Sequence, residues 1–441
     1  MTSDLKILVL PEAGQTPHLC YVTYVHAIQD NMVPARYKCL VDAHSGQLIY
    51  RVDEVKSMDK CPKCKKAKEI RRMGMMDVDI HVSAELYETT LLDPLSTESL
   101  PNLQVIIGNE TYYTDPEGNL NLDLTGPIDA NFALQGLWSQ VNTDDLIPDF
   151  DIEIEDGSSE ITFDGNANVK ELSAYRSVNA IHDHMKAWLP DFTGLDYSMP
   201  TNIDIAGSCN AFYDGEINFF DAGGGCNATS LLADVVYHEY GHGINNLYYS
   251  DNGMNYNNGA MNEGYADWWA ISLTDNPHLG EGFFDDTPDG IRRYDIDPKV
   301  YPQDLVGEVH ADGEIICGAW YDTHLLMGGN WDNTMELFIN TYAGFQAVGM
   351  NGNEGTIFFD VLLDALQADD DNADLADGTP NDIAIIEGFA IHGIYLLSGA
   401  EIIHENPLAM DAEDDLLIDA EVLIQFPFGI YLQEVVLYHK I

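Results

Sequence analysis

The sequence predicts a multidomain α+β protein, in which strand-rich segments precede a mainly helical one. Up to residue 145, short apolar or alternating runs are separated by turn residues, as is typical of strands. From about residue 160 to 398, apolar residues recur at helical spacing. The chain has 441 residues, which is too long for one ordinary domain and indicates two to four.

The first part of the chain predicts a small strand unit and a linker. Residues 1–56 hold four apolar or alternating runs, and Asp42–Gly46 has the composition of a hairpin turn between the last two. Residues 57–75 are basic and almost without large apolar side chains, so they predict an accessible linker. It ends near the pair Arg71 and Arg72.

Three further segments follow. Residues 76–148 predict a small all-β sandwich, because short strands recur at regular spacing with turns between them. Residues 149–398 predict one larger, mainly helical domain, and residues 399–441 return to strand-like alternation, as at the start of a further β domain. Helices are predicted over residues 169–189, 229–248, 259–273, 312–327, 335–348, 354–368 and 382–397. Thr229 or Ser230 is the expected N-cap of the second.

The charge of the chain is strongly negative and uneven. Acidic residues number 74 and basic residues 19, for a net charge of −55. Residues 1–72 carry +4, and residues 73–441 carry −59. So acidic a body repels nucleic acid and anionic membranes, and we expect neither as a partner. No run approaches 18 consecutive apolar residues, so no membrane span is predicted.

The acidic residues have three interpretations that do not exclude one another: a surface suited to a salty medium, calcium sites, or no role. The densest loop is Asp369–Asp377. Calcium would relieve the repulsion within it and is a second candidate cofactor. The spacing is not that of an EF-hand, and a solvated turn is the alternative.

Seven cysteines leave at least one thiol without a partner in the chain. Cys209 and Cys226 bracket a short Gly-rich segment and predict a disulfide, with two reduced thiols as the alternative. Cys61 and Cys64 form a lone CxxC pair, which cannot complete a tetrahedral metal site by itself. There are three interpretations: a local disulfide, a metal site that Cys20 and Cys39 help to complete, or a thiol that reaches the metal site described next.

The pattern HEYGH over residues 238–242 is typical of a zinc site. On a helix, His238 and His242 lie one turn apart on the same face and can bind one Zn²⁺. Glu239 follows the first histidine and can reach a zinc-bound water as a general base. Two histidines that merely pack on a helix are the alternative.

A catalytic zinc needs a third protein ligand and an open fourth position. Asn245 and Tyr248 occupy the positions where the metzincin pattern has Gly and His, so that pattern is excluded. The next predicted helix offers Glu263 as the third ligand. Asp267 lies four residues on, where it can accept the N–H of a ligand histidine, although a solvated helix acid is the alternative.

HEYGH followed by the NEGYAD block at residues 262–267 resembles the gluzincin peptidases, meaning thermolysin and above all the fungalysins. The segment Val309–Glu314 is similar to the fungalysin VHxxGE block, and Asn210–Tyr213 to the family's edge-strand block. The resemblance implies a catalytic domain with a mixed N-terminal lobe and a helical C-terminal lobe.

The resemblance also implies roles for further residues. His310 would stabilise the oxyanion, and Asn210 and Ala211 would hold the substrate backbone. Tyr256 is the nearest candidate for the tyrosine that assists the oxyanion. Leu305 stands where thermolysin has an acid that orients its histidine, so Asp304 or Glu308 would serve instead.

Residues 1–56 resemble the second half of a fungalysin propeptide, and the first half and any signal peptide are absent from this chain. This resemblance implies a secreted zymogen that is inhibited by its own propeptide. The β segment at 76–148 is not part of the minimal family plan.

We therefore expect a secreted zinc metalloendopeptidase that hydrolyses polypeptides with a zinc-activated water. One alternative is an aminopeptidase on the same zinc site. The other is a surface-binding protein with a vestigial site, against which the presence of Glu239 argues.

Overall fold

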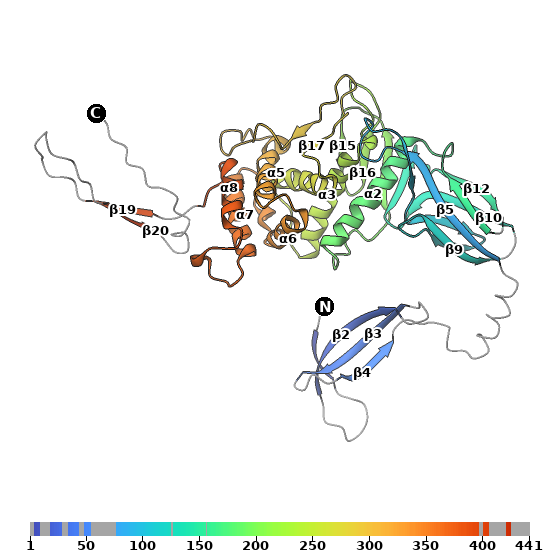
Figure 1. Cartoon of the computed structure of the whole chain (residues 1–441), viewed down its shortest axis with the longest axis horizontal. Coiled ribbons are helices and arrows are strands. Elements are labelled where there is room, and N and C mark those ends of the chain that lie inside the picture. Colours follow the sequence, from blue (N-terminus) through green and yellow to red (C-terminus); the bar gives the residue numbers. More distant parts are fainter. Residues whose placement is uncertain are drawn as a thin grey trace, which may run out of the picture. The chain divides into compact units, whose positions relative to one another are not determined.

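The computed structural model describes residues 4–8, 18–28, 34–43, 48–53, 76–124, 127–155, 157–396, 400–404 and 420–424 (Figure 1). The chain divides into two compact units. One comprises residues 1–76 with 123–125, and the other comprises residues 77–122 and 126–441. The predicted linker, residues 57–75 with Cys61 and Cys64, lies outside the described residues.

The first unit is an antiparallel four-stranded sheet in the order β1-β2-β3-β4. Its strands are β1 (Asp4–Leu8), β2 (His18–Ile28), β3 (Pro34–Asp42) and β4 (Leu48–Asp53). The pairing of Val41 with Leu48 places the β3–β4 connection where the sequence predicts a hairpin turn. The identity of this unit as a propeptide remnant remains a prediction.

The second unit contains two larger sheets. One has the order β13-β5-β6, with β9 also paired to β5. The other has eight strands, in the order β15-β16-β14-β11-β10-β7-β8 with β12 paired to β10. The strands are β5 (Met76–Leu86), β6 (Ser96–Ser99), β7 (Leu103–Ile107), β8 (Glu110–Tyr113), β9 (Asn119–Leu124), β10 (Ile128–Gly136), β11 (Ser139–Thr143), β12 (Asp149–Ile154), β13 (Gly157–Thr162), β14 (Met199–Ile205), β15 (Ala211–Tyr213) and β16 (Ile217–Phe220).

The eight-stranded sheet crosses the predicted boundary at residue 148. Strand β11 pairs in parallel with β14, so strands from the predicted β-sandwich and from the predicted catalytic segment share one sheet. The domain boundaries themselves remain predictions. The physical consequence is that the β segment and the site-bearing segment form one continuous structure.

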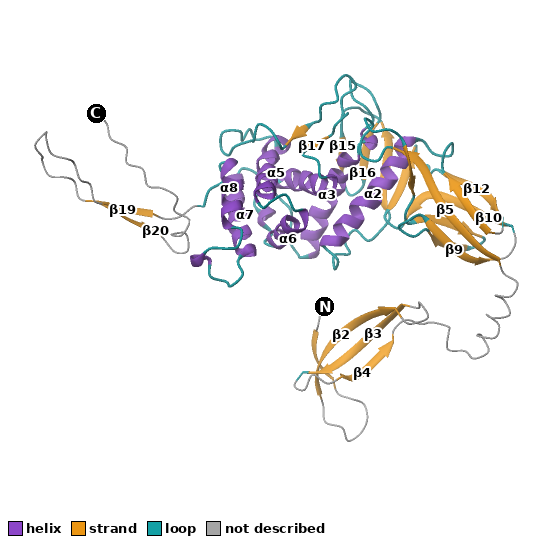
Figure 2. Ribbon diagram, viewed as in Figure 1, coloured by secondary structure: helices purple, strands orange, loops and turns teal. Residues whose placement is uncertain are grey.

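Helices fill most of the rest of the second unit (Figure 2). They are α2 (Val169–Trp188), α3 (Ala233–Asp251), α4 (Gly259–Thr274), α5 (Val309–Leu326), α6 (Trp331–Tyr342), α7 (Glu354–Asp369) and α8 (Asp382–Ile391). Two small antiparallel strand pairs are also present: β17 (His278–Leu279) with β18 (Arg292–Arg293), and β19 (Ala400–His404) with β20 (Ala420–Ile424). The predicted α+β class is therefore confirmed, and none of the described helices is long and apolar enough to cross a bilayer.

The core of the helical part is aromatic. Trp268, Trp320, Phe338 and Tyr342 are fully buried, and Phe338 packs against each of the other three rings at centroid distances of 5.3–5.6 Å. Burial of such large apolar side chains anchors α4, α5 and α6 to one another.

Two close helix crossings need glycine. A Cβ on Gly241 in α3 would lie 2.9 Å from the Cα of Ala266 in α4, and a Cβ on Gly264 in α4 would lie 2.6 Å from the carbonyl oxygen of Gly313 in α5. Glycine lets the backbones approach this closely. The crossings bring α3, α4 and α5 together where their functional side chains lie.

Two expectations about helix starts are corrected. Neither Thr229 nor Ser230 caps the helix that carries the HEYGH pattern: α3 begins at Ala233 after a 3₁₀ turn, and its N-cap residue Leu232 makes no side-chain cap. The Thr229 hydroxyl instead donates to the carbonyl of Asn210 (3.1 Å). Helix α5 begins at Val309 rather than residue 312, so His310 lies in its first turn.

Candidate active site

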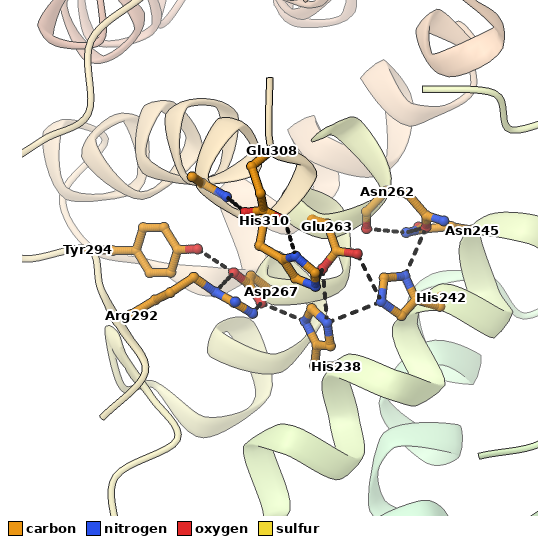
Figure 3. A network of polar contacts seen from close by, with 11 residues as sticks. His238, His242, Asn245, Asn262, Glu263, Asp267, Arg292, Tyr294, Glu308 and His310 are labelled. Atoms are coloured by element: carbon orange, nitrogen blue, oxygen red, sulfur yellow. Dashed lines mark hydrogen bonds and ion pairs between the residues drawn. The ribbon is translucent and has the colours of Figure 1, made fainter. Parts of the chain in front are cut away.

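Three side chains from two helices converge on one point (Figure 3). The Nε2 atoms of His238 and His242 lie 3.1 Å apart. The carboxylate of Glu263 on α4 faces both, with Oε2 3.3 Å from His238 Nε2 and Oε1 3.7 Å from His242 Nε2. The spacing of four residues on α3 and the crossing at Gly241 produce this arrangement.

The other nitrogen of each imidazole is already engaged. His238 Nδ1 lies 2.6 Å from Asp267 Oδ1, and His242 Nδ1 lies 3.1 Å from Asn262 Oδ1. Both partners accept, so each Nδ1 carries a proton, and Nε2 is the nitrogen that each ring turns toward the same point. Both histidines are therefore held in the tautomer that a metal ligand needs.

The donor set fits zinc. Two imidazole nitrogens and a carboxylate oxygen are the ligands that catalytic zinc takes, with a fourth position left for water or substrate. Glu263 Oε2 is buried and has no hydrogen-bond donor, an arrangement that a cation satisfies. Burial would raise the pKa of Glu263, but His238, His242 and His310 outweigh it and lower the pKa to about 2.

Asp267 is the centre of the support behind His238. The Arg292 guanidinium donates to both of its oxygens, at 2.6 and 2.7 Å, and the Tyr294 hydroxyl donates to Oδ2. Burial opposes ionisation of Asp267, but Arg292 and His238 hold its pKa well below the usual range. Asp267 is thus a buried carboxylate with three donors, and not a solvated helix acid.

The support behind His242 is a chain of amides. The Tyr342 hydroxyl donates to Asn245 Oδ1 (2.9 Å), and Asn245 Nδ2 donates to Asn262 Oδ1 (2.9 Å). These bonds fix the orientation of both amides, so the oxygen of Asn262 faces His242.

Sequence reasoning did not assign roles to Arg292, Tyr294, Asn245, Asn262 or Tyr342. One indication of a role for Arg292 is present in the sequence, because residues 73–441 contain only seven basic residues. A buried cation in so acidic a segment needs a specific partner. Asn262 lay inside the NEGYAD block but has no metal-binding pattern of its own.

Glu239 lies beside the converging ligands and is buried. One of its oxygens falls within 4.8 Å of ligand atoms of His238 and His242. Burial raises the pKa of Glu239 to about 7, with His238 opposing and Glu263 adding to the effect. A carboxylate with such a pKa can exchange protons near neutral pH.

His310 reaches over the site from the start of α5. Its Nε2 lies 3.5 Å from Glu263 Oε2, and its Nδ1 lies 2.6 Å from Glu308 Oε1. Glu308 also caps α5 by accepting the N–H of Ala311 (3.0 Å). Of the two candidates for orienting His310, the structure therefore brings Glu308 to it, whereas Asp304 accepts the N–H of Val300.

These residues lie in an open cleft of about 720 Å³. Its rim includes Asn210 and Ala211, which belong to or adjoin β15 at the edge of the eight-stranded sheet. An apolar wall is formed by Val235, Leu279, Phe283 and Ile291. The edge strand offers backbone groups to an extended peptide.

Tyr256 is not among the residues that line the cleft. Its hydroxyl donates to the carbonyl of Met261 (3.1 Å), and its ring packs against Tyr249. Tyr213 on β15 does line the cleft. The structure therefore does not bring Tyr256 to the cleft, because its hydroxyl donates to the first turn of α4.

The predicted disulfide is present: Cys209 and Cys226 are bonded, with their Cα atoms 5.3 Å apart. Cys209 directly precedes Asn210, so the disulfide fixes the approach to β15.

The contacts of the acidic loop do not support calcium. Asp369 accepts from the Thr379 hydroxyl and from the backbone and side chain of Asn381, each at 2.6 Å. Asn372 Nδ2 donates to Asp377 (3.0 Å). The carboxylates of Asp369 and Asp377 are therefore satisfied by donors of the loop and of the residues directly after it.

The fold and the converging donors of His238, His242 and Glu263 fit one class of protein, the metallopeptidases. Residues 214–380 match the family model described as Fungalysin metallopeptidase (M36), which confirms the predicted resemblance over the segment that carries the site. Zinc dependence is a property of this family, in agreement with the donor set. A comparison with curated proteins gives no match.

Proposed function

We propose that the protein is a secreted zinc metalloendopeptidase. The observation that carries this proposal is the convergence of His238, His242 and Glu263 in an open cleft, with buried Glu239 beside them. Zinc, when held by these three residues, supplies a Lewis acid that polarises the peptide carbonyl and acidifies water.

Residues of the chain bind the substrate, transfer the proton and stabilise the negative charge. An extended peptide pairs with β15, held by Asn210 and the backbone of Ala211. Glu239 takes a proton from the attacking water and passes it to the leaving amine. His310, oriented by Glu308, donates to the oxygen that becomes negatively charged.

Cleavage within chains is favoured over removal of N-terminal residues. An aminopeptidase needs a free acid to bind the substrate amine. The carboxylates that line the cleft are Glu239, Glu263 and Glu308. The first two serve the metal and the proton, and Glu308 is engaged by His310 and Ala311. Among the described lining residues no acid remains for an amine.

Secretion as a zymogen is a further part of the proposal. The Cys209–Cys226 disulfide is typical of oxidising compartments. We propose that residues 1–56 are the C-terminal part of an inhibitory propeptide, 57–75 a linker cut on activation, 76–148 a β segment, 149–398 the catalytic segment and 399–441 the start of a β domain. N-terminal sequencing of the active species tests the cut, and full activity of the uncut chain would contradict it.

The central test combines metal analysis with digestion. We expect about one zinc per chain after mild dialysis and cleavage of an unfolded protein at internal bonds, identified by mass spectrometry of the products. A peptide with an acetylated N-terminus separates the alternatives, because an aminopeptidase cannot cut it. Zinc without any hydrolysis, also after cleavage in the linker, would favour the vestigial binding protein.

A further inference from the structure

Apart from Val235 on α3, the apolar wall of the cleft belongs to a loop with little regular structure. The wall segment, defined as residues 278–293, begins and ends in the two-residue strands β17 and β18. It carries Leu279, Phe283, Ile291 and Arg292 into the cleft. Two residue pairs form its hairpin, so its position must depend on neighbouring elements.

One set of contacts comes from α3 and the turn before it. The carboxylate of Asp234 accepts the N–H of Gly280 (2.6 Å), and the side chain of Asn227 donates to the carbonyl of Gly282 (2.9 Å). The backbone N–H of Asn227 donates to the carbonyl of Phe283 (2.9 Å). These bonds hold the inner side of the wall segment.

A second set comes from far away in the sequence. The β5–β6 loop, residues 87–95, belongs to the predicted β segment. Its Thr90 hydroxyl donates to the carbonyl of Glu281 (2.8 Å). Gly282 has a φ of +80°, and a Cβ at this position would lie 3.2–3.3 Å from side-chain atoms of Thr90, Leu91 and Leu92. The loop therefore packs closely against the wall segment.

The same loop also caps the zinc-site helix. Leu232 offers no side-chain acceptor at the N-cap of α3. The N–H of Ala233 instead donates to the carbonyl of Thr89 (2.8 Å). One loop thus contacts both the helix with the metal ligands and the wall of the cleft.

Internal bonds make the β5–β6 loop a fixed support. The Thr90 hydroxyl accepts the N–H of Leu92 (3.2 Å), and the Asp93 carboxylate accepts the N–H of Thr90 (3.0 Å). The N–H of Asp93 donates to the carbonyl of Thr90 (3.0 Å). The hydroxyl of Thr90 is therefore held in place when it donates to the wall segment.

We propose that the β5–β6 loop determines which apolar side chains the cleft accepts, with Thr90 as a positioning residue that acts through the wall segment. The proposal rests on the proposed peptidase function. It gives the β segment a role in specificity: the loop fixes the distance between Val235 on α3 and the residues Leu279, Phe283 and Ile291. The accepted ligand is a bulky apolar side chain next to the cleaved bond.

The test uses the full chain, cut in the linker where activation requires it, with peptides that carry Ala, Leu or Phe on either side of the cleaved bond. Thr90→Val removes the hydroxyl at nearly constant shape. We expect kcat/KM for the best bulky substrate to fall about 3–10-fold through KM, the effect of one hydrogen bond. Hydrolysis of the Ala peptide and zinc content should change less than twofold. Thr90→Ser keeps the hydroxyl and should retain the preference for bulky substrates. Thr111→Val on exposed β8 is the matched control.

Equal loss on all peptides, or an unchanged ratio between bulky and small substrates, would overturn the proposal. If Thr90→Val does not fold, Leu92→Ala replaces it, because the Leu92 side chain is half-exposed. The ratio of kcat/KM between bulky and small substrates is then measured on that variant. Failure of the unaltered protein to cleave any peptide would refute the proposed function instead, so the two failures are distinguishable.

Discussion

Glu239 is the residue on which turnover should depend most directly. It does not support the histidines, whose Nδ1 atoms are held by Asp267 and Asn262. Its burial places an ionisable oxygen beside the ligand atoms. Replacing its carboxylate by an amide of the same shape should therefore spare metal binding and remove the proton acceptor.

Glu239→Gln should keep zinc and lose turnover by roughly 10²–10⁴, the usual contribution of a general base. Zinc content and kcat on one peptide substrate are the two measurements. Ordinary turnover with a full complement of zinc would remove Glu239 from the mechanism.

Glu263 and Asp267 lie on the same face of α4 but differ in what they contact. Glu263→Ala should abolish tight zinc binding, because it removes a ligand. Asp267→Ala should weaken zinc affinity only about 10–100-fold, because it removes the acceptor behind His238. Competition with a chelator of known affinity measures both, and a larger loss in the Asp267 variant would show that the two roles are reversed.

Asp267→Ala should also destabilise the metal-free protein. It leaves Arg292 buried without its carboxylate, and loss of one partner of a buried ion pair costs about 3–5 kcal/mol. The melting temperature of the metal-free Asp267 variant should therefore fall further than that of metal-free Glu263→Ala.

At the scale of elements, helical periodicity predicted the helices that carry the metal ligands. It could not predict how they begin. The α3 N-terminus is capped by the carbonyl of Thr89, which lies more than 140 residues away in the sequence. The first turn of α5 has little apolar pattern and is defined by the Glu308 cap.

The residues that support the ligand histidines could not be predicted from the sequence, for a similar reason. The HExxH spacing encodes the two histidines within one helix, so a pattern can reveal them. Arg292 reaches Asp267 from an irregular wall segment, and Tyr342 reaches Asn245 from α6. Such contacts depend on tertiary packing and have no fixed spacing in the sequence.

The attachment of the wall segment to α3 should make stability depend on pH. Burial raises the pKa of Asp234 from 3.8 to about 6, against the opposing hydrogen bonds from Gly280 and Val235. Between these values the folded protein holds a proton that the unfolded chain has lost. The stability from this proton is present below about pH 4 and is lost as the pH rises through 6.

Asp234→Asn cannot titrate, so its stability relative to the unaltered protein should increase from pH 4 to pH 7. A difference of about two between the pKa values corresponds to about 3 kcal/mol at most. Melting temperatures of both proteins across this range measure the change, with Asp191→Asn at an exposed position as the control. Parallel curves would show that Asp234 does not titrate in this window.

At the scale of the whole molecule, charge is the dominant feature. Residues 73–441 carry 66 acidic and 7 basic residues. Within this part, Lys170, Lys186, Arg292 and Arg293 already form ion pairs with aspartates. Most carboxylates therefore have no lysine or arginine as a partner, and their mutual repulsion opposes the compact state.

Sodium chloride should raise the melting temperature of the protein. At 1 M salt the Debye length is about 3 Å, against about 10 Å at 0.1 M, so repulsion between surface carboxylates is screened. The same salt weakens the exposed ion pairs, but each contributes at most about 1 kcal/mol. The Arg292–Asp267 pair is buried and is screened less. Because unpaired acids greatly outnumber paired ones, the screening of repulsion should exceed the loss of ion pairs.

A melting temperature that falls with NaCl would contradict this prediction. A rise caused by calcium but not by NaCl of matched ionic strength would favour specific metal sites among the acidic loops.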